Sequence, residues 1–274
     1  MIKFEIERRP NGRLFLYSNS ANLKTHESYE RTAQGMDLHV ALYPGDLLYW
    51  FGWAAALFVL LFPLWIGGKL GLVARRKFER VWALVLVGAY LAMTGLTIAR
   101  GEFSWGGSLL FHMCGFSRLL LIGYFFTGKR WMGELVTFTG IAGGLQSLLT
   151  PEFTHGINFV YAFDYYVNHA SIIGVGFYII IVQHHRLKKG AWLRSFGRIQ
   201  LFALIALGVN LVTGGNYMYL MEPPIADNPV IITSENFDYL HVVFFEVFAA
   251  VNFWLIELLL RRIHVKNSLG YRTV

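Results

Sequence analysis

The chain has 274 residues, of which 55% are hydrophobic and only 15% charged, and its mean hydropathy is +0.46. This composition excludes an ordinary soluble domain and predicts an integral membrane protein. Its single cysteine excludes an internal disulfide and a multi-cysteine metal site. The net charge of +7 comes mainly from basic residues beside hydrophobic runs, where they act as topology signals, so we expect no nucleic-acid partner.

Residues 1–46 form a mixed-charge segment without the hydrophobic stretch of a cleavable signal peptide. Apolar and polar residues alternate over 3–8 and, in part, over 13–17, and Pro10-Asn11-Gly12 lies between them. This pattern predicts a small β-hairpin on the extracytoplasmic side. A disordered leader is the alternative, because an isolated hairpin is only marginally stable in water.

Seven apolar runs follow, each near the roughly 20 residues needed to span a bilayer. They cover about 47–66, 81–99, 107–126, 133–149, 163–182, 199–219 and 239–260. We therefore predict an all-α, seven-helix transmembrane domain over residues 47–262 and a tail over 263–274.

Lysine and arginine residues gather after the first, third, fifth and seventh runs. The connection after the sixth run is acidic, with Glu222, Asp227, Glu235 and Asp238. By the positive-inside rule, the N-terminus is outside and the C-terminus, with the tail, is cytoplasmic. The basic residues of the first 46 positions run against this assignment, which makes that segment its weakest point.

Polar residues of five runs are predicted to fall in one layer near the outer surface, from the helix rise of 1.5 Å per residue. His112 and Cys114 come five to seven residues into the third run, and Asn168 and His169 five or six residues into the fifth. The other members lie at run ends: Gln146, Thr150, Asn216, Tyr217 and His241. Because hydrocarbon excludes such groups, we expect them to line a shared pocket. The alternative to a shared pocket is that these residues simply lie near the membrane surface, where polar side chains are tolerated.

Cys114 is the candidate nucleophile in this pocket. His112 lies two residues away and faces elsewhere on a regular helix, so His169 from another helix is the better candidate base. Arg118, at i+4 from Cys114, favours a thiolate or instead forms a structural ion pair with Glu246 in the seventh run. Cys114 could also be a small buried hydrophobe without chemistry.

Metal chemistry has less support in the sequence. His112, His169, His241 and Cys114 could supply ligands, but the spans contain no HExxH motif and no histidine pair at i and i+4. We therefore expect no metal and no other cofactor.

Four segments carry a resemblance to a known family: His112-Met113-Cys114, the run Gly143-Gly144-Leu145-Gln146-Ser147-Leu148-Leu149-Thr150-Pro151, Asn168-His169, and Gly215-Asn216-Tyr217-Met218-Tyr219-Leu220 with Pro223-Pro224. Over about residues 45–262 the chain resembles the YwaF-like family of bacterial membrane proteins, whose animal relatives include a transmembrane acyltransferase of ether phospholipids. The resemblance implies acyl transfer in a bacterial plasma membrane, with Cys114 as nucleophile and His169 as its partner.

The resulting hypothesis is acyl transfer or hydrolysis on a membrane lipid, with amide groups of Gln146 or Asn216 stabilising the oxyanion. The remaining polar residues of the layer are assigned to substrate binding or support: His112, Thr150, Asn168, Tyr217 and His241. Two alternatives are an amphiphile receptor that uses the same pocket without covalent chemistry, and a structural subunit that docks a protein partner through residues 1–46.

Overall fold

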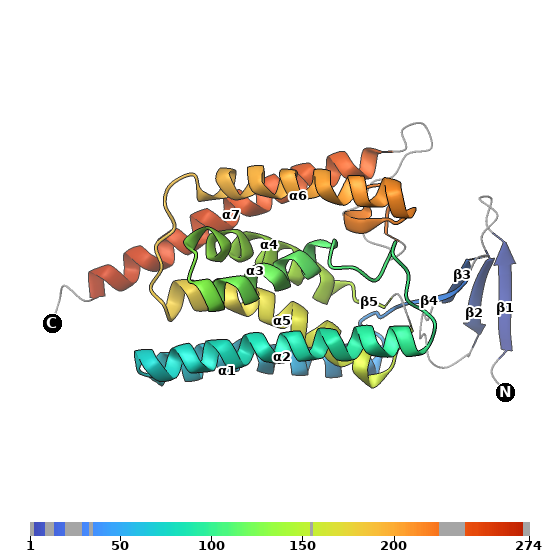
Figure 1. Cartoon of the computed structure of the whole chain (residues 1–274), viewed down its shortest axis with the longest axis horizontal. Helices are drawn as coiled ribbons and strands as arrows, with labels where there is room; N and C mark the ends of the chain where they lie inside the picture. Colours follow the sequence, from blue (N-terminus) through green and yellow to red (C-terminus); the bar gives the residue numbers. More distant parts are fainter. Residues whose placement is uncertain are drawn as a thin grey trace.

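A computed structural model describes residues 3–8, 14–19, 29–32, 35–153, 156–224 and 239–270. The described residues form seven α-helices that run alternately up and down, with a small sheet at one end of the bundle (Figure 1). The helices are α1 (Leu47–Lys69), α2 (Leu72–Ala99), α3 (Met113–Thr127), α4 (Arg130–Leu149), α5 (Phe159–Ile181), α6 (Ala191–Thr213) and α7 (Leu240–Gly270). A 3-10 turn, η1 (Tyr217–Tyr219), follows α6. The predicted seven-helix bundle is thus confirmed.

Helices α4 and α5 form the centre of the bundle. They pack on each other, with α3 beside α4, α1 and α2 beside α5, and the α6–α7 pair against α4 (Figure 1). Small residues permit the close crossing of α4 and α5, because a Cβ on Gly140 would lie 2.1 Å from the carbonyl oxygen of Ile172. Close approach at small residues is a common way to pack helices in a membrane.

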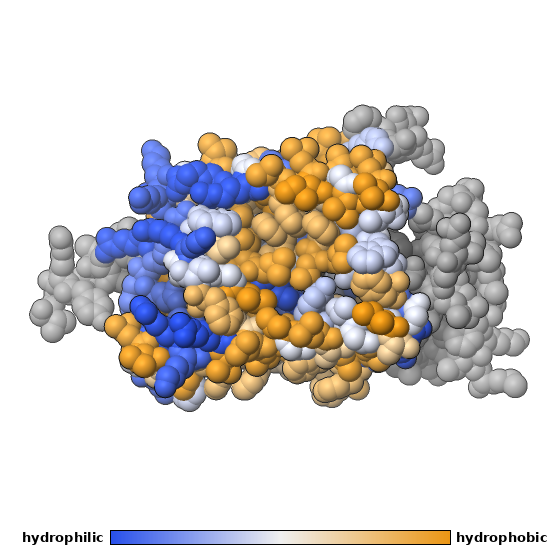
Figure 2. Space-filling model, viewed as in Figure 1, coloured by the Kyte–Doolittle hydropathy of each residue, from blue (hydrophilic) through white to orange (hydrophobic). Residues whose placement is uncertain are grey.

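Four helices are long and apolar enough to cross a membrane: Leu47–Lys69, Leu72–Ala99, Ala191–Thr213 and the Leu240–Ile263 part of α7. These outer helices carry many exposed large hydrophobic side chains, such as Phe58, Leu84 and Leu204. Hydrophobic residues accordingly cover most of the middle of the face in Figure 2. Such a surface is suited to lipid rather than to water.

Several helices extend beyond the expected runs: α2 begins at Leu72 rather than 81, α6 at Ala191 rather than 199, and α7 ends at Gly270 rather than 260. At two other boundaries the helix is shorter than the run. The third run was expected to be helical from residue 107, but α3 begins at Met113, because the chain from 104 to 112 makes turns and Leu109 donates its N–H to the Tyr217 hydroxyl instead of to a helix carbonyl. The sixth run was expected to reach residue 219, but α6 ends at Thr213. Its C-cap is Gly214, with a left-handed φ of 69° that terminates the helix.

The N-terminal hairpin is confirmed as strands β1 (Lys3–Arg8) and β2 (Leu14–Asn19), which pair antiparallel. The turn expected at Pro10-Asn11-Gly12 lies outside the described residues. The sequence analysis missed three further strands, β3 (Tyr29–Thr32), β4 (Gly35–Ala41) and β5 (Glu152–Phe153), which complete a five-stranded antiparallel sheet in sequence order. The β4–β5 pairing attaches the N-terminal segment to the connection between α4 and α5.

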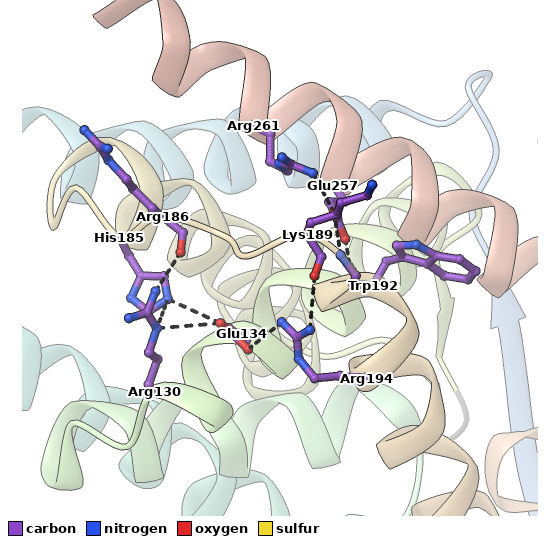
Figure 3. A network of polar contacts seen from close by, with 10 residues as sticks. Arg130, Glu134, His185, Arg186, Lys189, Trp192, Arg194, Glu257 and Arg261 are labelled. Atoms are coloured by element: carbon purple, nitrogen blue, oxygen red, sulfur yellow. Dashed lines mark hydrogen bonds and ion pairs between the residues drawn. The ribbon is translucent and has the colours of Figure 1, made fainter. Parts of the chain in front are cut away.

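The opposite end of the bundle gathers the basic connections, and hydrophilic residues concentrate there in Figure 2. Two buried carboxylates hold this end together (Figure 3). Glu134 of α4 lies 3.6 Å from Arg130, 3.8 Å from His185 and 4.0 Å from Arg194. Glu257 of α7 accepts N–H bonds from Gly190 and Trp192 at the first turn of α6. A carboxylate at a helix N-terminus satisfies free N–H groups and complements the helix dipole.

We expect the α4–α5 crossing to limit stability. Gly140→Ala should lower the free energy of unfolding by about 1–3 kcal/mol, because the new methyl group meets a backbone carbonyl that cannot move independently. Gly88→Ala is the matched control: a Cβ at Gly88 has no neighbour within 4 Å, so alanine should stabilise α2 by about 0.5–1 kcal/mol. Unfolding of the purified protein in detergent measures both; equal effects would contradict the packing argument.

Candidate functional site

A cavity of about 410 Å³ lies within the helix bundle, toward the end that carries the sheet. Helices α2 to α7, η1, β5 and the connection between α2 and α3 all contribute to its wall. Several predicted site residues share this wall: His112, Cys114, Gln146, Thr150, Asn168 and His169. The chain thus brings polar side chains from three separate segments to a single space.

Cys114 lies in the first turn of α3, whose N-cap residue is His112. The first intrahelical hydrogen bond reaches Phe116, so the N–H groups before it have no partner within the helix. Those of Cys114 and Gly115 lie against the thiol. The N-terminus of a helix favours negative charge, so this placement favours a thiolate or an oxyanion beside Cys114, whereas burial of the sulfur opposes the thiolate.

His169 is buried in α5 and has a fixed tautomer. Its Nδ1 lies 2.7 Å from the backbone oxygen of Tyr165, one turn earlier in the same helix. A carbonyl oxygen can only accept, so Nδ1 carries the proton and Nε2 keeps its lone pair. His169 is thus prepared to accept a proton at Nε2.

Arg118 and Tyr165 are neighbours of both candidate catalytic residues. The guanidinium of Arg118 interacts electrostatically with both Cys114 and His169. The ring centroids of Tyr165 and His169 lie 4.2 Å apart with the planes tilted by 44°, and the Tyr165 hydroxyl interacts electrostatically with Cys114. Cys114 and His169 therefore share two neighbours, Arg118 and Tyr165.

The buried Arg118 has a different partner from the one expected. Its Nη2 donates to Asp164 Oδ2 at 2.8 Å and its Nε to Asn168 Oδ1 at 2.8 Å, both on α5. The expected ion pair between Arg118 and Glu246 is wrong. Helix α3 packs against α5, which brings Asp164 within reach of Arg118. Glu246 instead accepts a hydrogen bond from Gln200.

Three predicted site residues lie behind the cavity wall. The Asn216 amide is bonded to backbone atoms of Met221 and Glu222, and the hydroxyl of Tyr217 to those of Leu109 and Trp105. The Nε2 atom of His241 bonds the Tyr219 oxygen. These contacts indicate support of the α6–α7 connection, and the Asn216 amide is not placed to stabilise an oxyanion in the cavity.

The supported segment carries backbone strain next to the cavity. Met218 and Tyr219 both have left-handed φ values, 56° and 54°, although neither is a glycine. The N–H of Met218 donates to His112 Nδ1 at 3.3 Å, and both residues line the wall. His112 therefore holds η1 in place with one nitrogen, and strain of this kind persists only where surrounding contacts over-determine it.

Gln146 and Thr150 face the cavity from the end of α4, and the Gln146 side-chain amide lies 3.5 Å from the Thr150 hydroxyl. Sequence reasoning missed Asp164, Tyr165 and Tyr90, which also line the wall. Asp164 was detectable: it is the acidic residue of α5 and precedes Asn168 by one turn, on the same helix face. Within the described part of the chain, no three His, Cys, Asp or Glu side chains gather as metal ligands would.

A family model described as the TMEM164 family matches residues 43–257. The chain belongs to the TMEM164 family. No curated protein and no solved structure matches it. The TMEM164 match begins before α1 and ends within α7, so it includes every residue of the cavity wall. Together with the four apolar helices, it identifies an integral membrane protein.

The cavity of this TMEM164-family chain should depend on the Tyr217 hydroxyl, which joins the α2–α3 connection to η1. Tyr217→Phe should lower the free energy of unfolding by about 1–3 kcal/mol, because the N–H of Leu109 and the oxygen of Trp105 lose their shared partner. Thermal unfolding in detergent provides the measurement. Tyr239→Phe, at a half-exposed tyrosine, is the control and should have little effect; an equal loss in both variants would refute the role of this bridge.

Proposed function

We propose that this protein is a membrane-embedded enzyme that transfers or hydrolyses lipid acyl chains, with Cys114 as nucleophile and His169 as general base. The observation that carries the proposal is the cavity wall shared by a thiol at a helix N-terminus and a buried imidazole with a free Nε2 lone pair. The resemblance to YwaF-like proteins and their acyltransferase relatives supports the same chemistry.

In the first step, His169 Nε2 takes the thiol proton and the sulfur attacks the carbonyl carbon of an acyl ester. The ester C–O bond breaks, a thioester forms, and the proton passes from His169 to the leaving alkoxide. In the second step, His169 removes a proton from an acceptor hydroxyl, which attacks the thioester and releases the thiolate to be reprotonated. With water as acceptor, the outcome is hydrolysis.

The tetrahedral intermediate needs hydrogen-bond donors at the oxygen that becomes negative. The N–H groups of Cys114 and Gly115 are the best placed, because they lie against the sulfur at the start of α3. The Gln146 amide is the second candidate, since it faces the same cavity. Asn216 is left out of this role because its amide is bonded within its own loop.

Acylation by p-nitrophenyl oleate, followed by mass spectrometry of the intact protein, tests the proposal. We expect one oleoyl group on Cys114, no labelling of Cys114→Ala, and labelling about 10²-fold slower in His169→Asn. His184→Asn is the matched control: His184 is exposed and has a left-handed φ of 54°, which asparagine tolerates well. Labelling that persists in Cys114→Ala, or an unchanged rate in His169→Asn, would refute the enzyme and favour a receptor for amphiphiles.

We further propose that all seven helices cross a bacterial plasma membrane, with the N-terminal sheet outside. The basic connections α1–α2, α3–α4 and α5–α6 lie together at the end opposite the sheet, which supports a cytoplasmic location for that end (Figure 1). The extracytoplasmic segment 1–46 would then be accessible to a protein partner.

Single cysteines in a Cys114→Ser background test this orientation. A membrane-impermeant maleimide applied to intact cells should label Glu222→Cys, on the sheet side, and should label Lys189→Cys only after lysis. Both positions are exposed in the structure, so accessibility alone does not separate them. The reverse pattern would overturn the topology.

A further inference from the structure

Two buried polar atoms on the cavity wall have no hydrogen-bond partner among the described residues: Nη1 of Arg118 and Oδ1 of Asp164. The two side chains are only 3% and 10% exposed. Buried donors and acceptors in proteins are almost always bonded, so two orphans on one wall call for an explanation. Neither atom has a role in the proposed acyl transfer.

The geometry of the ion pair leaves both atoms available. Arginine and carboxylate groups often form two parallel hydrogen bonds. Here the pair makes a single one, between Nη2 and Oδ2, and the Nε of Arg118 donates to Asn168. The ring of Tyr90 lies 5.4 Å from the guanidinium carbon and limits its movement. The Nη1 atom with its two N–H groups and one carboxylate oxygen therefore remain without a partner among the described residues, held by the surrounding bundle.

The charge of the wall restricts the ligand. Among the described residues that line the cavity, Arg118 is the single lysine or arginine, whereas Glu152, Asp164 and Glu246 are all acidic. The positive charge of Arg118 is already balanced by Asp164 at 2.8 Å. A phosphate or free carboxylate here would face more negative than positive charge in a medium of low polarity, which is unfavourable.

We propose that Arg118 and Asp164 form a recognition site for the uncharged, hydroxyl-bearing part of a lipid, such as a glycerol ester. A ligand oxygen accepts from Arg118 Nη1, and a ligand hydroxyl donates to Asp164 Oδ1. This inference rests on the lipid-binding cavity of the proposed function and does not depend on its covalent step. In this proposal Asp164 and Arg118 select the ligand through the hydrogen-bond acceptor and donor that they offer.

Three probes with the same oleoyl chain separate the contributions. Monoolein offers both an acceptor and hydroxyl donors, methyl oleate offers only the acceptor, and oleate is anionic. The full chain carrying Cys114→Ser, which prevents turnover through the thiol, is incubated in detergent with pairs of probes, and mass spectrometry quantifies the lipid that co-purifies. We expect monoolein to be retained about tenfold over methyl oleate, the gain of one hydrogen bond to a charged group, and oleate to be retained least.

Asp164→Asn is the decisive variant. Its amide oxygen stays on Arg118, so a nitrogen replaces the free acceptor, and the positive charge of Arg118 loses its counterion. The ratio of retained monoolein to retained methyl oleate should fall toward one, and the amount of retained oleate should increase. Glu134→Gln is the matched control, since it neutralises another buried, ion-paired carboxylate at the far end of the bundle and should leave the ratios unchanged (Figure 3).

Arg118→Lys provides the test if Asp164→Asn does not fold, because lysine keeps the charge opposite Asp164 and removes Nη1. Monoolein and methyl oleate should then both bind several-fold more weakly, with their ratio preserved. Unchanged retention in a folded Arg118→Lys or Asp164→Asn protein, or oleate ahead of monoolein in the Cys114→Ser parent, would overturn the proposal. Failure of Cys114 acylation with these ratios intact would refute the enzyme alone.

Discussion

The bundle depends on a constraint set by its solvent: hydrocarbon offers no partner for a polar group, so each buried charge must be satisfied by the protein. Arg118 is where this constraint is most demanding. Its bonds to Asp164 and Asn168 tie α3 to α5, and α5 in turn packs on α1, α2 and α4. Because Arg118 lies one turn from Cys114 and next to His169, the group that secures the helices also fixes the surroundings of both proposed catalytic residues.

The two ends of the bundle satisfy their buried polar groups in different ways. At the basic end, Glu134 and Glu257 gather arginines and free N–H groups from several connections, so charge is neutralised inside the protein. At the sheet end, Tyr217, Asn210 and His241 satisfy backbone groups of the irregular segment around η1. The cavity lies at the second end, beside the strained turn around η1.

The sequence was sufficient for the helix count, the N-terminal hairpin and the membrane location, because those follow from hydrophobic run length and from the alternation of apolar and polar residues. It was not sufficient for the start of α3, where an apolar stretch from residue 107 makes turns that are stabilised by the distant Tyr217. Nor could it choose between Asp164 and Glu246 as the partner of Arg118, since that depends on which helices pack together. The two-residue strand β5 carries no pattern of its own and forms only because β4 lies beside it.

The sheet has a mechanical consequence. Strand β4 pairs with β5 through Val40–Phe153 and Ala41–Glu152, and both residues of β5 belong to the cavity wall. The N-terminal strands are thus coupled by backbone hydrogen bonds to the lining of the cavity. A load applied to these strands would be transmitted to the cavity wall through the β4–β5 pairing, in addition to the path along the chain into α1.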